Sequence, residues 1–133
     1  MKKLIIFIII AIVLSGCSIE KTEDSQKEQN IKFTIMDEDE VPIQIIDMID
    51  NQKEEPFRFS YIVGDEMYIA VGYGEQPTGG YSIQVKGLYE TKDSIIIDTE
   101  LLGPSKEDLV TMALTYPRII VKINHIDKPV YYQ

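Results

Sequence analysis

Side chains that commonly carry covalent or metal chemistry are scarce in this chain. Its 133 residues include one cysteine, Cys17, and one histidine, His125. A nucleophilic site needs a serine or cysteine with a base in reach, and no Gly-x-Ser-x-Gly motif is present to expose a serine. Two such residues cannot supply the four ligands of a usual zinc site, and the 22 acidic residues single out no acid–base pair. We therefore expect no catalytic residue, no bound metal and no enzyme activity.

Cys17 instead has the surroundings of a lipid-modified cysteine. Two lysines near the N-terminus are followed by the unbroken apolar run Leu4–Leu14. As a helix this run would rise about 16 Å, roughly half the hydrocarbon thickness of a bilayer, which is typical of a signal peptide rather than a membrane span. It ends in Leu14-Ser15-Gly16-Cys17, which resembles the lipobox of bacterial lipoproteins.

The lipobox predicts how the N-terminus is processed. Small residues before Cys17 let the chain enter the signal peptidase, so residues 1–16 are expected to be a signal peptide. The thiol of Cys17 would then carry covalent diacylglycerol and the new N-terminus an N-acyl lipid, with no other cofactor. Two or more acyl chains anchor a protein stably. We expect a lipoprotein of the cell envelope, held on the outer face of the bacterial cytoplasmic membrane.

The charge of the chain limits its partners. The net charge is −9, and the loss of residues 1–16, which hold two lysines and no acidic residue, would make it more negative still. Such a chain has no basic surface to neutralise phosphates, so nucleic acid is not expected as a partner. Residues 17–30 are polar and contain one large apolar residue, Ile19, which predicts a lipidated cysteine followed by a flexible acidic linker.

The acidic run Asp37–Glu40 could suggest a calcium loop, but its spacing does not fit one. Val41 and Pro42 stand where such a loop needs a ligand and a glycine. Acidic residues also favour the positive end of a following helix. We expect that helix over residues 41–53, with an apolar stripe made of Pro42, Ile45, Ile46 and Ile49.

The segment Gln76-Pro77-Thr78-Gly79-Gly80-Tyr81 is the most distinctive loop in the sequence. Pro77 fixes its own φ, and the two glycines can adopt positive φ. Such a loop could present Thr78 and backbone N–H groups on a rigid platform, with Tyr73 and Tyr81 at its base, and so bind a protein. The alternative is a hairpin connection that simply requires glycine.

Period-two alternation predicts the elements that would position this loop. Strands are expected over residues 31–35, 57–63, 67–73, 94–102 and 118–123, and a further strand begins at Tyr81 and ends before the turn at residues 91–93. Ser105 with Asp108 predicts one capped helical turn at Leu109 and Val110. Short turns between strands favour antiparallel pairing. Residues 31–133 should therefore form one β-rich α+β domain, an antiparallel sheet or small sandwich of about 5–7 strands with one amphipathic N-terminal helix.

The stretch from Pro77 to Ile83, after Gly72-x-Gly74 and before Thr115-Tyr116-Pro117, resembles the PrcB C-terminal domain family. The similarity covers roughly Tyr61 to Ile123. Members of this family look like bacterial surface lipoproteins, and the family takes its name from a subunit that associates with and stabilises an extracellular protease complex. The resemblance implies a non-catalytic protein-binding module whose partner is a secreted or surface protease, contacted through residues 76–81.

The same loop is similar to the Asn-Pro-Thr-Thr-Gly-Tyr/Phe loop of chagasin-type inhibitors of cysteine peptidases. Here Gln76 replaces the asparagine, Gly79 replaces the second threonine, and no tryptophan is present for the later Arg-Pro-Trp loop. A peptidase inhibitor is therefore a second hypothesis. A third is an envelope lipoprotein that binds a small ligand between the helix and the sheet.

Overall fold

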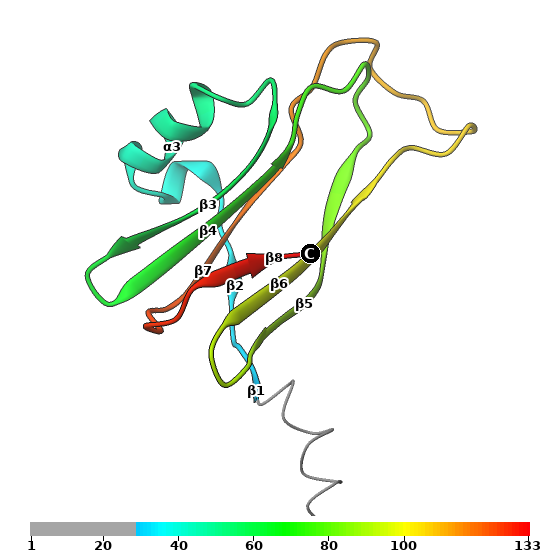
Figure 1. Cartoon of the computed structure of the whole chain (residues 1–133). Coiled ribbons are helices and arrows are strands. Elements are labelled where there is room, and N and C mark those ends of the chain that lie inside the picture. Colours follow the sequence, from blue (N-terminus) through cyan, green and yellow to red (C-terminus); the bar gives the residue numbers. More distant parts are fainter. Residues whose placement is uncertain (1–28) are drawn as a thin grey trace, which may run out of the picture.

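Two four-stranded sheets lie face to face in residues 29–133, the part of the chain that the computed structural model describes (Figure 1). One sheet has the strand order β1-β5-β6-β8 and the other the order β2-β7-β4-β3. The strands are β1 Gln29–Asn30, β2 Thr34–Ile35, β3 Pro56–Val63, β4 Glu66–Tyr73, β5 Ser82–Glu90, β6 Ile95–Leu102, β7 Arg118–Asn124 and β8 Val130–Tyr132. The predicted signal peptide, Cys17 and the linker up to residue 28 lie outside the described residues.

The main core fills the space between the sheets. Alternate residues of β4 and β7 face it from one sheet, and β5 and β6 close it from the other. Its buried members are Met67, Ile69, Val71, Leu88, Ile95, Ile97, Ile119, Val121 and Ile123. The period-two pattern predicted this face of β4 because a strand points successive side chains to opposite sides of the sheet. The predicted β-rich α+β class, with a small sandwich, is confirmed.

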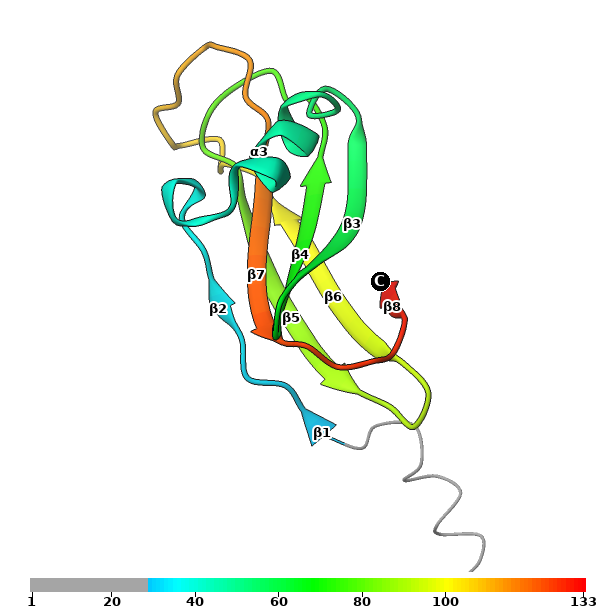
Figure 2. The same cartoon turned by 90° about the vertical axis from the view of Figure 1, so that its left-hand side faces the viewer.

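A second apolar layer lies on the outer face of the β2-β7-β4-β3 sheet, beneath α3 (Ile43–Asp50). Ile45 and Ile49 are fully buried there, in one cluster with residues of β3, β4 and β7. Figure 2 shows α3 lying across this sheet. Gly72 of β4 lies under the ring of Phe57, where a Cβ atom would be 2.1 Å from Cε2. The predicted helix, residues 41–53, is shorter at both ends: Pro42 has extended backbone before its first residue, and Asn51 starts a turn.

The N-terminal segment does not form the single strand expected over residues 31–35. β1 pairs with the end of β5, and the chain then crosses to the other sheet, where β2 pairs with β7. Ile35 is exposed because a segment that moves between two sheet edges has no common buried face. Gln29 and Asn30, predicted to end the linker, already belong to the folded domain.

Two further details depart from the sequence prediction. β8 was not expected; it pairs in parallel with β6, and with β1 and β2 it brings the described strands to eight. The capped helical turn near residues 109–110 is absent. Ser105 N–H does donate to Asp108 Oδ2 at 2.8 Å, and Asp108 N–H donates to Ser105 O at 3.1 Å. These bonds close a turn over residues 105–108, and no helical turn follows at Leu109 and Val110. Leu109 then extends into solvent.

Candidate functional site

The glycine-rich loop, residues 74–81, is a crossover between sheets. It leaves β4 in one sheet and enters β5 in the other, and these two strands do not pair. The hairpin alternative is therefore wrong. A second crossover, residues 103–117, runs from β6 to β7 in the opposite direction. Both lie at the end of the sandwich that is farthest from β1 (Figure 1).

Hydrogen bonds fasten the two crossovers together. Gln76 N–H donates to Thr115 O at 2.8 Å, and Thr115 N–H donates back to Gln76 O at 3.0 Å. Gly79 N–H donates to Thr111 O at 2.9 Å. The hydroxyl of Thr115 donates to Thr78 O at 2.6 Å. These bonds hold the loop against the second crossover, and the N–H groups of Gln76 and Gly79 are already bonded and do not face a ligand.

Close packing explains the glycine at position 80. Gly80 has φ +88°, and a Cβ atom there would lie 2.8 Å from Val110 Cγ1 and 3.0 Å from Pro104 Cβ. Tyr81 also contacts this crossover, because a Cβ atom on Gly103 would lie 3.3 Å from its ring. Of the predicted contact residues, Pro77 and Gly80 are exposed, while the other four are half-buried. Pro77 and Gly80 are therefore the exposed residues of the segment Gln76–Tyr81, which we call the ridge, and the segment supports the neighbouring crossover.

Two tyrosines brace the base of the site. The hydroxyl of Tyr73 lies 2.6 Å from Thr99 Oγ1 and so links the two sheets. Tyr116 donates its hydroxyl proton to Glu75 Oε1 at 3.3 Å, and Lys53 Nζ lies 4.9 Å from the centre of its ring. Partial desolvation, followed by the negative charge of Glu75, raises the pKa of Tyr116 above its ordinary value of 10.0. The phenol therefore stays neutral and keeps donating through physiological pH.

The crossover 103–117 also presents apolar side chains that the sequence analysis did not select. Leu109 is fully exposed, Met112 is 83% exposed and Leu114 is 57% exposed. Their sequence signal was the apolar run that follows Ser105–Asp108. The sequence predicts a helical turn at Leu109 and Val110, whereas the structure places Leu109, Met112 and Leu114 in solvent beside the glycine-rich loop.

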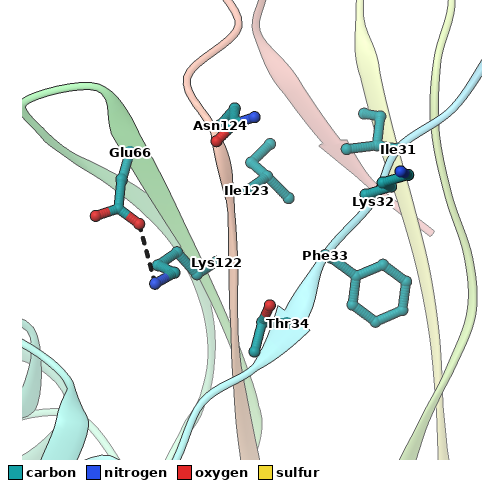
Figure 3. A pocket seen from close by; sticks show the side chains of 8 residues that line it. All are labelled: Ile31, Lys32, Phe33, Thr34, Glu66, Lys122, Ile123 and Asn124. Carbon is teal, nitrogen blue, oxygen red and sulfur yellow. Dashed lines mark ion pairs between the residues drawn. The ribbon is translucent and has the colours of Figure 1, made fainter.

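An open pocket of about 530 Å³ lies at the other end of the domain (Figure 3). The segment Ile31–Thr34 forms one wall, and the end of β7 with Glu66 of β4 forms the other. On that second wall, Lys122 Nζ pairs with Glu66 Oε2 at 3.1 Å. The hydrogen bond that Lys122 donates to Glu66, together with the negative charge of Glu66, raises the pKa of Lys122 above 10.5. The pocket lies between the N-terminal segment and a sheet, and not between helix and sheet as the small-ligand hypothesis expected.

The remaining candidates for chemistry lie apart from the crossovers. His125 is exposed just after the end of β7, and its backbone N–H donates to Asp65 O at 2.8 Å. Carboxylate oxygens of Asp37, Asp39 and Glu40 come within 4.8 Å of one another, and all three residues are exposed. Their neighbour Glu38 is engaged by Arg118, whose Nη2 lies 2.9 Å from Oε1. Exposed acidic clusters are common without an ion, so this one identifies no metal site.

Comparisons with known proteins agree with the N-terminal motif and the loop. Residues 67–124 match the PrcB C-terminal family, close to the range that the sequence resemblance suggested. Residues 1–18 match the prokaryotic membrane lipoprotein lipid attachment site, which includes Cys17. The protein is therefore a membrane-anchored lipoprotein, and its residues 67–124 are similar to the PrcB C-terminal family. Neither a curated protein nor a solved structure matches the chain. Within residues 29–133, no helix is long and apolar enough to cross a membrane.

Proposed function

From the match of residues 67–124 to the PrcB C-terminal family, we propose that this lipoprotein is a non-catalytic protein-binding module. Its partner is an extracellular protease, which it accompanies and stabilises. The observation that carries the proposal is the pair of bonded crossovers at the end of the sandwich farthest from β1. The contact is made through Gln76–Tyr81, with Pro77 at the centre of the exposed ridge.

Rigidity of the loop supports this role. A flexible loop loses conformational entropy when it binds, and a loop already held by hydrogen bonds loses less. Here the backbone of Gln76 and Gly79 is fixed by the second crossover before any partner arrives. The site holds no nucleophile–base pair; its polar groups, such as Thr115 Oγ1 and Tyr116 Oη, are engaged in structural bonds.

The proposal includes a lipid anchor at the N-terminus. We propose that residues 1–16 are removed as a signal peptide and that Cys17 carries the lipid on the outer face of the cytoplasmic membrane. Cys17→Ala should move the protein from the membrane fraction to the soluble fraction, without a change in its far-UV circular dichroism. A Cys17→Ala protein that stays in the membrane fraction after an alkaline wash would contradict anchoring by lipid at this residue.

The partner is tested by chemical crosslinking of the full-length protein in its native membrane, followed by mass spectrometry. We expect a near-stoichiometric secreted peptidase in the crosslinked product. Pro77→Asp should abolish that product. Pro129→Asp should not, because Pro129 is also exposed but lies at the β1 end of the domain. Retention of the peptidase by Pro77→Asp would refute the contact through this loop.

The activity of the captured peptidase separates stabilisation from inhibition. A stabilising partner lengthens the half-life of peptidase activity at 37 °C and leaves the initial rate unchanged. A chagasin-like inhibitor lowers the initial rate. A clean lipoprotein with no peptidase in any crosslinked product would overturn the proposed function altogether.

A further inference from the structure

Three large apolar side chains project from one short stretch of the crossover 103–117. Leu109 is fully exposed, Met112 is 83% exposed and Leu114 is 57% exposed. A single exposed leucine is ordinary on a protein surface, but several within a few residues mark an interaction site. We call these three residues the apolar tip.

The apolar tip is held in place. Thr111 O accepts from Gly79 N–H, and Thr115 is bonded to Gln76 in both directions, so bonds fix the chain on either side of Met112. Val110 packs against Gly80. Backbone order of this kind keeps the three apolar side chains in solvent instead of letting them fold back onto the domain. Their exposure is thus built into the fold.

The membrane in which the protein is anchored is a poor binding partner for the apolar tip. β6 runs its full length, Ile95–Leu102, between the β1 end of the domain and the start of the crossover. Residues 17–28 reach at most about 40 Å when fully extended. The strand covers about 27 Å of this, and the crossover extends beyond it. To bring the tip to the bilayer, the linker would have to stretch back along the whole domain.

Charge also disfavours a second copy and indicates what the partner must offer. Glu75, Glu107 and Asp108 lie in the two crossovers, where Lys106 is the one cation among residues 74–81 and 103–117. Next to Tyr116, the turn before β3 adds one charge of each sign, Lys53 and Glu54, so the surface stays acidic. Two identical acidic tips repel each other. A partner with lysine or arginine around an apolar pocket gains attraction at the rim and apolar burial at the centre.

These observations lead to one assignment. We propose that Leu109, Met112 and Leu114 enter an apolar pocket with a basic rim on a different extracytoplasmic protein, and that they supply most of the binding affinity beside the Gln76–Tyr81 ridge. This inference rests on the proposed function for its protein partner. It also has a separate requirement, which is that the affinity depends on the crossover 103–117.

A photo-crosslinking amino acid in place of Leu114 tests it in the full-length protein in native membranes, with the same amino acid in place of Ile62 as the matched control. Ile62 is also apolar and half-exposed, but lies in the β3–β4 hairpin at the opposite end. We expect one protein adduct at position 114 and none at 62. Mass spectrometry should map it to apolar residues next to lysine or arginine.

Variants then measure the affinity. Leu109→Ser with Met112→Ser should lower the yield at position 114 at least tenfold, since truncated central anchors commonly cost that much. Ile62→Ser should leave the yield unchanged, and all variants should keep the melting temperature because the altered side chains are exposed. Glu107→Lys should lower the yield several-fold by opposing the basic rim.

The outcomes separate this inference from the proposed function. If the mapped pocket belongs to a protein that is not a peptidase, the proposed function fails and the apolar tip stands. If a peptidase is bound in a Pro77-dependent way and binds the double serine variant as well as the parent chain, the proposed function stands and the inference about the apolar tip is overturned. Adducts with lipid, adducts with a second copy, or no adduct at position 114 would each overturn it as well.

Discussion

Gly80→Ala tests whether the two crossovers are packed as the structure shows. Gly80 combines φ +88° with a Cβ position only 2.8 Å from Val110 Cγ1. A non-glycine residue with positive φ costs about 1–2 kcal/mol. Relief of the overlap with Val110 and Pro104 adds about 1 kcal/mol, near the lower limit for overpacking, because the neighbours lie in a surface loop and can shift. We expect the free energy of unfolding to fall by about 2–3 kcal/mol.

Gly79→Ala, at the adjacent position, is the matched control. Gly79 is not among the glycines with positive φ, and its Cβ atom would lie 3.6 Å from Thr111, an ordinary contact distance. Alanine there should leave stability unchanged or raise it by up to about 1 kcal/mol, because it restricts the unfolded chain.

Urea unfolding of the full chain in detergent micelles measures both variants. The chain has no tryptophan, so far-UV circular dichroism is a better probe than fluorescence. The slope of the free energy against urea should stay constant while the midpoint shifts. Hydrogen exchange at Thr115 N–H, which bonds to Gln76, should accelerate in Gly80→Ala alone. Equal stability of the two variants would refute the argument from φ and from the Val110 contact.

Three further outcomes test the core and the C-terminal strand. Gly72→Ala should destabilise by about 1–3 kcal/mol through the overlap with Phe57, and Phe57→Leu should recover part of the loss in a urea double-mutant cycle. Ile45→Ala should cost about 2–5 kcal/mol, and exposed Ile43→Ala less than about 1 kcal/mol, in the same assay. Burial raises the pKa of Tyr132 above 10.0, so its contribution to stability is complete below pH 10 and is lost as the pH rises further; Tyr132→Phe should lose less stability than the parent chain between pH 9 and 11.

Local patterns were enough to predict most strands. The alternation of Met67, Ile69 and Val71 identified β4 because one face of that strand lines the sandwich core. The same pattern was silent about Tyr68 and Ala70 on the other face, which are buried only because α3 covers them. β8 is three residues long and forms by parallel pairing with β6. No local pattern in the sequence predicts this pairing.

The site was predictable on one side and not on the other. Proline and adjacent glycines marked the loop 76–81 because those residue types restrict or free φ in ways that rigid turns need. Its partner crossover could not be found in this way. The bond from Thr115 Oγ1 to Thr78 O joins residues 37 positions apart, and such contacts depend on how both sheets pack. For the same reason the exposure of Leu109 was missed.

The place where the chain enters the fold also determines how the protein bears mechanical load. β1 joins the domain at the end of β5, with Gln29 opposite Glu90 and Ile31 N–H donating to Leu88 O. A pull between the membrane and a molecule gripped at the crossovers therefore acts along the strands. Bonds between antiparallel strands run across that direction, so the pull loads them together, in shear, and does not open them one after another. With a partner bound at the crossovers as proposed, the domain would be oriented to resist stretching between that partner and the bilayer.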